Sequence, residues 1–176
     1  MPTFSNQIPA DPRGQSFPII RTPIGHSLNA IVTSVDLVGT YTHYYKGRTA
    51  PCDQPDCEPC RHGLPYRWHN YLSAYQFSKG LHFLFECTAK AGEPFIEYRK
   101  KYDTLRGAQF ESQRYSNKPN GRVLIRCKPA DLQGILLPKP PHLVRALCIL
   151  WNVPYDQLLD PELDVENRPK EIKKER

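Results

Sequence analysis

Residues 43–72, with the sequence HYYKGRTAPCDQPDCEPCRHGLPYRWHNYL, contain the pattern on which the predicted fold depends. The centre of this stretch, residues 46–65, holds four prolines, two glycines and three cysteines, a composition typical of a loop without regular structure of its own. The flanking residues are rich in aromatic side chains, which favours strands. The sequence therefore predicts a cysteine-bearing loop inserted between two strands.

The three cysteines of this loop have the spacing Cys52-x4-Cys57-x2-Cys60. Prolines interleaved with them restrict the backbone, so that the loop can wrap around one ion. Thiolates gathered in this way are typical ligands of Zn²⁺, which prefers four tetrahedral nitrogen or sulfur ligands in structural sites. We therefore expect a zinc site that needs one more ligand.

Two histidines compete for the fourth position. His43 stands at the end of the preceding predicted strand, and a ligand from there would tie the loop to the sheet. His62 follows the last cysteine of the loop by two residues, so that both reaching one ion would strain the chain. His43 is the preferred fourth ligand, His62 is the alternative, and Cys87 is less favoured than either.

Other uses of these cysteines are less consistent with the sequence. A thiol-exchange pair at Cys57 and Cys60 is opposed by Pro59 between them and by the acidic neighbours Asp56 and Glu58, which raise thiol pKa values. A catalytic zinc needs an open coordination position and a nearby acid or base, and the His-x-Glu element of nucleobase deaminases does not occur here. The expected zinc is therefore structural.

The rest of the chain adds further strand patterns. Runs of β-branched and aromatic residues bounded by turn residues predict five strands at 28–45, 66–77, 80–89, 107–115 and 121–129. The first is one long strand or a bent pair about Gly39. Asn120-Gly121 predicts a hairpin between the last two. Residues 96–102 fit a short helix or a strand.

A late helix completes the predicted fold. Residues 140–153, PPHLVRALCILWNV, begin with proline and carry apolar residues at helical spacing. The expected fold class is mainly β: a small OB-like barrel or a curved antiparallel sheet, with an inserted zinc knuckle and a C-terminal helix. The predicted organisation is an extended Pro-rich arm at 1–27, one β-rich domain at 28–151 with the zinc knuckle at 43–63, and a polar mixed-charge tail at 152–176.

Composition and charge limit the possible functions. The 176 residues carry a formal net charge of +6, and residues 43–128 hold 15 Lys and Arg against 8 Asp and Glu. No apolar stretch is long enough to span a membrane, and the N-terminus lacks the layout of an export signal, so we expect a soluble, cytoplasmic protein without a membrane partner. The basic surplus falls on the predicted strands and knuckle.

Cations and aromatic rings alternate in that region, a mixture typical of proteins that bind single-stranded DNA or RNA, in which cations follow phosphates and rings stack on bases. The candidate contacts are Arg48, Arg67, Trp68, Tyr71, Arg99, Lys100, Lys101 and Arg114. The stretch at 43–72 also resembles a zinc knuckle inserted in a β-barrel, as in some single-strand-binding and replication accessory proteins. The likeness covers about thirty residues and is architectural. The expectation of nucleic-acid binding without catalysis comes from the alternating cations and rings.

Two other functions are compatible with the same residues. One is a structural or adaptor module held together by zinc, with protein partners that bind the termini. The other is a zinc-dependent hydrolase or nuclease, although carboxylates are scattered and neither a Gly-rich phosphate loop nor a GxSxG turn occurs. We therefore expect a binding protein and not an enzyme.

Overall fold

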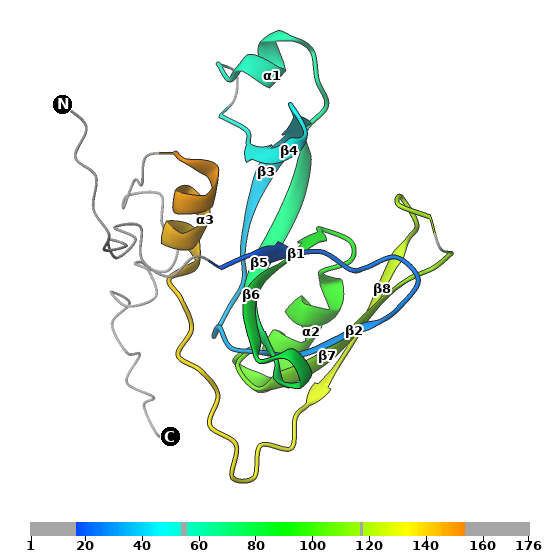
Figure 1. Ribbon diagram of the computed structural model, residues 1–176, viewed down its shortest axis with the longest axis vertical. Helices are drawn as coiled ribbons and strands as arrows, with labels where there is room; N and C mark the ends of the chain where they lie inside the picture. The colour runs from blue at the N-terminus through cyan, green and yellow to red at the C-terminus, as the bar shows by residue number, and fades with distance from the viewer. Residues whose placement is uncertain (1–16, 54–55, 117, 154–176) are drawn as a thin grey trace, which may run out of the picture.

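The structure is a computed structural model that describes residues 17–53, 56–116 and 118–153. This part of the chain forms one mixed sheet of eight strands with three α-helices (Figure 1). The strands are β1 (Ile19–Ile20), β2 (Leu28–Val32), β3 (Val38–Tyr45), β4 (Arg48–Pro51), β5 (Arg67–Gln76), β6 (Leu81–Thr88), β7 (Ala108–Arg114) and β8 (Val123–Pro129). The α-helices are α1 (Glu58–Arg61), α2 (Glu93–Tyr102) and α3 (Leu143–Trp151).

Strand β5 organises the sheet because it has partners on both sides. It is antiparallel to β6 from His69 to Gln76. On its other side it pairs first with β3 and then, near its end, with β2. Strand β2 continues to β7, and β7 to β8. The predicted hairpin between the last two strands is confirmed.

The predicted long strand at 28–45 is a bent pair, but its bend differs from the prediction. β2 ends at Val32 and β3 begins at Val38, whereas Gly39 lies within β3. Hydroxyl groups interrupt the strand: Thr33 Oγ1 lies 2.7 Å from Ser73 Oγ, and the backbone N–H of Ser73 donates to Ser34 Oγ across 3.1 Å. Both contacts join the break between β2 and β3 to Ser73 of β5, where they stand in place of regular strand pairing.

The order β1-β6-β5-β2-β7-β8 has two free ends, so among the described residues the sheet is open and not closed into a barrel. It is also mixed, because β1 runs parallel to β6. The mainly β prediction is confirmed, together with the late helix and the cysteine-bearing insertion. The purely antiparallel arrangement is wrong at β1.

Both faces of the central sheet are covered by apolar clusters. Helix α2 lies within the curve of the sheet (Figure 1), where its Phe95 packs among Phe85 and Phe110. Helix α3 covers the opposite face, where Trp151 meets the ring of Tyr71 edge to face at 5.4 Å. The helical alternative for residues 96–102 is therefore the correct one.

The knuckle has more regular structure than the sequence predicts. Lys46 and Gly47 both have positive φ, 50° and 79°, and turn β3 into the short strand β4. Two-residue turns of this kind match the twist of a hairpin. Helix α1 follows, with Pro59 in its first turn. Figure 1 shows α1 and the β3–β4 hairpin extending away from the rest of the sheet.

The end of the predicted arm lies on the sheet. The backbone N–H of Leu84 donates to the Pro18 carbonyl across 2.9 Å, and Arg21 pairs with Glu86. Residues 1–16 of the arm and residues 154–176 of the tail lie outside the described part of the chain. No helix of the described residues is long and apolar enough to cross a membrane.

Candidate metal centre and adjoining cleft

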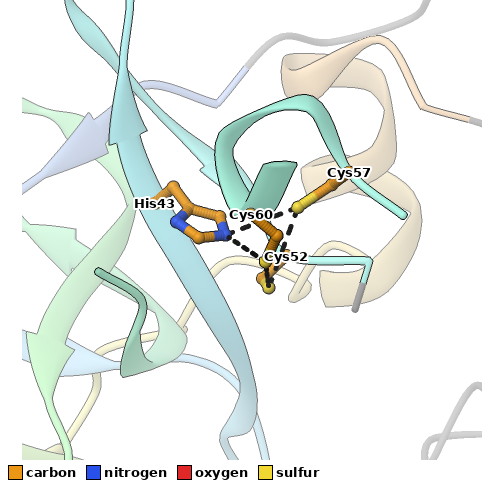
Figure 2. Close-up of side chains that lie close together, drawn as sticks. All are labelled: His43, Cys52, Cys57 and Cys60. Atoms are coloured by element: carbon orange, nitrogen blue, oxygen red, sulfur yellow. Dashed lines mark hydrogen bonds between the residues drawn. The ribbon is translucent and has the colours of Figure 1, made fainter. Parts of the chain in front are cut away.

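Four side chains from the knuckle and β3 converge on one point (Figure 2). Cys52 Sγ lies 4.0 Å from Cys57 Sγ and 3.5 Å from Cys60 Sγ. His43 Nε2 lies 3.4 Å from Cys57 Sγ and 3.3 Å from Cys60 Sγ. Ligand atoms at about 2.3 Å from a tetrahedral ion are separated by about 3.8 Å, so this arrangement has the size of a four-ligand site. The group could hold a metal ion.

The orientation of His43 suits metal binding. Its side chain is buried, and its Nδ1 lies 2.9 Å from the carbonyl oxygen of Pro65. A carbonyl oxygen only accepts, so Nδ1 carries the proton and Nε2 presents its lone pair to the thiols. Backbone carbonyls fix the tautomer of metal-binding histidines in this way.

The two other proposed fourth ligands lie elsewhere. His62 has an exposed side chain that stacks on the ring of Tyr45 and lies 4.0 Å from Glu58. Cys87 is buried in the core cluster, where burial raises the pKa of its thiol to about 12. The convergent group contains His43 and neither of these residues.

The surroundings raise the pKa of the Cys52 and Cys60 thiols and lower that of Cys57. Burial and the neighbouring thiols raise the pKa of Cys52 to about 12. Burial opposes ionisation of Cys57 too, but hydrogen bonds from the backbone and thiol of Cys60 lower the pKa of Cys57 to about 7. A bound metal requires thiolates, so Cys57 is the sulfur most readily available to an incoming ion.

A second set of contacts ties α1 to β3. The hydroxyl of Tyr45 donates to Glu58 Oε1 across 2.6 Å, and Lys46 Nζ lies 3.2 Å from the same oxygen. These hydrogen bonds lower the pKa of Glu58 below its ordinary value, so this carboxylate is ionised and engaged in structure. A carboxylate with a lowered pKa is a weaker base than an ordinary one.

A cleft of about 770 Å³ adjoins the knuckle, bounded by the start of β5, the end of β6 and the β7–β8 loop. Among the described lining residues are five cations and one carboxylate, Glu86. The cations are Arg21, Arg67, Lys90, Arg114 and Arg122. Tyr44, whose ring is 70% exposed, also lines it. The cleft therefore presents a surplus of positive charge to solvent.

Contacts within the cleft hold part of this charge in place. Glu86 is 3% exposed and receives hydrogen bonds from Arg21 Nε at 2.5 Å and from the Tyr71 hydroxyl at 3.0 Å. Arg114 donates to the carbonyl oxygens of Thr22 and Gly121, at 2.9 and 3.3 Å. The only carboxylate among the described lining residues is thus already satisfied by the protein.

Metal centre and cleft lie on opposite faces of one strand. Thr42 and Tyr44 line the cleft, whereas His43 between them belongs to the thiol group. Successive side chains of a strand point to opposite faces. A metal ion that held the His43 side chain in place would therefore also hold Thr42 and Tyr44 in place on the cleft side.

The structure separates the predicted nucleic-acid contacts into groups. Arg67 and Arg114 line the cleft. Arg48 lines a neighbouring hollow that shares Arg21 and Glu86 with the cleft. Trp68 is exposed on β5. The prediction that Tyr71 contacts nucleic acid is corrected, because its side chain is fully buried between Trp151 and Glu86 and cannot reach a base.

Three further predicted contacts lie on α2 and do not line the cleft. Lys100 and Lys101 are exposed there, and Arg99 pairs with Asp36 at 2.5 Å. Sequence reasoning missed the cleft residues Arg21, Lys90 and Arg122. Each is a single cation in a different segment, so no local pattern marks it.

The chain matches no protein-family model, no curated protein and no solved structure.

Proposed function

We propose that this chain is a zinc-stabilised protein that binds single-stranded DNA or RNA without catalysis. The observation that carries the proposal is the cleft, in which five cations surround one carboxylate that the protein itself satisfies. Clefts lined by one sign of charge concentrate the opposite charge, and phosphate contacts supply most of the affinity for nucleic acid. A flexible polyanion is the ligand that this surface favours.

Zinc is the proposed metal because three sulfurs and one imidazole nitrogen form its typical structural ligand set. Four protein ligands leave no open position for a substrate or a water molecule. The bound ion would supply folding energy to the knuckle, which has little apolar core of its own. This favours a structural zinc over the hydrolase or nuclease alternative.

The strand pairing supports an OB-like interpretation of the sheet, in partly open form. The five strands would be β2 and β3 together as one bent strand, then β5, β6, β7 and β8. Helix α2 lies between the third and the fourth. OB folds bind oligonucleotides with the loops between strands 1 and 2 and between strands 4 and 5. In this assignment those loops are the knuckle and residues 115–122, which border the cleft.

Single strands fit the cleft better than a duplex. The apolar faces of helices α2 and α3 pack against the sheet. Neither helix can therefore insert that face into the major groove of a DNA duplex. An exposed ring, Tyr44, stands beside the cations, an arrangement suited to an unstacked base. Strands with unpaired bases are the form of nucleic acid that can use both features.

The decisive experiment measures binding of the full chain to a fluorescent oligothymidylate at two salt concentrations, with zinc quantified in the same preparation. We expect the logarithm of the affinity to fall linearly with the logarithm of salt, by about 0.7 for each phosphate contacted. Arg67→Ala should weaken binding, whereas Lys79→Ala, an exposed cation outside the cleft, should not. Absence of binding at low salt, or binding that ignores salt, would refute the proposal.

A further inference from the structure

Three exposed aromatic rings lie together on the face of strands β3 and β5 that is opposite the cleft. Tyr41 and Tyr66 are each 47% exposed, and Trp68 is 39% exposed. The ring of Tyr41 meets Trp68 edge to face at 5.0 Å and Tyr66 at 5.3 Å. Aromatic residues this exposed lose the benefit of burial, so a cluster of three calls for an explanation.

The Trp68 ring is held in place by the protein. Its indole lies so close to Gly39 that a Cβ at position 39 would overlap with the ring. Its Nε1 proton is donated to Asn70 Oδ1 across 2.9 Å. The glycine and the asparagine thus orient the ring before any ligand arrives. A preorganised aromatic surface binds a flat partner without a large loss of side-chain entropy.

The ring cluster is next to the cationic cleft. Arg67 and Trp68 are consecutive in β5, and they point to opposite faces, Arg67 into the cleft and Trp68 onto Tyr41. The pairing of β6 with β5 stops at His69, so the edge of β5 on that side carries no ladder partner at residues 67 and 68. A single strand of nucleic acid that leaves the cleft at Arg67 can pass around this edge of β5 to reach the three rings.

We propose that Tyr41, Tyr66 and Trp68 form a stacking platform for the bases of the same single strand whose phosphates bind in the cleft. The inference rests on the proposed function and extends it from charge recognition to base recognition. Stacking tolerates any sequence because every base has a π face. Continuity with a cation-lined cleft selects a nucleic acid over an apolar protein partner for these rings.

Tryptophan fluorescence tests the platform directly, because the chain has only two tryptophans, Trp68 and Trp151. In a Trp151→Phe protein all tryptophan emission comes from Trp68. In the reciprocal Trp68→Phe protein it comes from Trp151, the last residue of α3, which is 9% exposed. Each full-length variant is titrated with oligothymidylate and with an abasic oligonucleotide of the same length, which has the same phosphates and no bases.

We expect oligothymidylate to quench Trp68 and to leave Trp151 unchanged, and the abasic strand to quench neither. In the otherwise natural chain, Trp68→Leu should weaken oligothymidylate binding by about 5- to 150-fold, the range for loss of one stacked base. Affinity for the abasic strand should stay the same. Should Trp68→Leu fail to fold, the quenching measurement still decides, because it leaves the platform intact.

Two negative outcomes are distinguishable. Salt-dependent binding of both oligonucleotides with equal affinity and no quenching of Trp68 would overturn the platform and leave the proposed function standing. Binding of neither oligonucleotide at low salt would overturn the proposed function and the platform with it. Quenching by an acidic, tyrosine-rich peptide in the absence of quenching by oligothymidylate would also overturn the platform and indicate a protein partner.

Discussion

The imidazole of His43 donates its Nδ1 proton to the carbonyl oxygen of Pro65 across 2.9 Å. His43 belongs to β3, and Pro65 lies two residues before the start of β5. This bond therefore joins the chain segments on either side of the cysteine-bearing loop. The same ring presents Nε2 to the thiols of Cys57 and Cys60. One side chain therefore links the metal centre to the two strands that border the cleft.

The first prediction concerns metal content. The purified protein should carry about one equivalent of zinc, and Cys57→Ser should lose most of it, because a hydroxyl is a poor replacement for a thiolate ligand. Cys148→Ser is the matched control, since that thiol lies on α3 and outside the convergent group. Elemental analysis of both variants provides the measurement. A fully folded natural protein without metal would contradict the prediction.

The second prediction concerns removal of the metal from the natural chain. Chelation should release the knuckle and lower oligothymidylate affinity by about tenfold or more, because Tyr44, Thr49 and Pro65 line the cleft and lose their fixed positions. The sheet should persist, since its apolar clusters are formed away from the thiols. Far-ultraviolet circular dichroism and a binding titration test the two parts. Unchanged oligothymidylate affinity after complete zinc removal would contradict this prediction and show that binding does not depend on the knuckle.

The third prediction compares cations inside and outside the cleft. Arg67→Ala and Arg122→Ala should each reduce the slope of log affinity against log salt by about 0.7, the contribution of one phosphate contact on a single strand. Lys101→Ala, on α2, should leave the slope unchanged because this cation does not line the cleft. Equal effects of all three substitutions would show that the net charge of the protein, rather than the cleft, attracts the oligonucleotide.

The fourth prediction separates stability from binding at Tyr71. Tyr71→Phe removes the hydroxyl that donates to Glu86 and should lower the free energy of unfolding by about 1.5–3 kcal/mol, the usual contribution of a hydrogen bond to a charged group. Oligonucleotide affinity should not change, because the ring is fully buried. Urea unfolding and the binding titration test the two effects on the same variant. A selective loss of affinity would restore Tyr71 as a contact.

The fifth prediction concerns pH. Burial, and then the charge of Arg106, lower the pKa of His82 below its ordinary value of 6.5. The unfolded chain therefore takes up this proton first as the pH falls through 6.5, so acid destabilises the folded state through this residue. His82→Gln should lose less stability than the natural chain between about pH 7.5 and pH 5.5. His69 shifts in the same direction, but it is present in both proteins and cancels in the difference.

Urea unfolding at several pH values measures the effect at His82. Both proteins should be compared in the presence of excess zinc, so that protonation of the metal ligands is equal in the two series. Parallel pH profiles would show that His82 does not titrate differently in the folded and unfolded states.

Much of the metal centre follows from local sequence. Three thiols within nine residues can reach one ion without help from distant segments, and the strand before them ends near His43. The β class follows for a similar reason, since β-branched and aromatic runs bounded by turn residues favour strands over most of the chain. The choice of His43 over His62 needed an argument about the sheet, because both are near in sequence.

The orientation of strand residues was harder to predict. Residues 70–74 of β5 are all buried, so alternation of polar and apolar side chains cannot tell which face is exposed. The reason is that α2 covers one face and α3 the other, and only their packing shows that Tyr71 is inaccessible.

The sequence by itself therefore determined the mainly β class, the late helix and the group of His43 and three cysteines that could hold a metal ion, because each depends on residues close together in the chain. The tertiary structure alone decided the cleft. Arg21, Lys90 and Arg122 come from segments far apart in sequence, and they meet because β1 lies against β6 and the loop between β7 and β8 lines the same cleft. Contacts of that range are set by the packing of the whole chain, and no local pattern of residues specifies them.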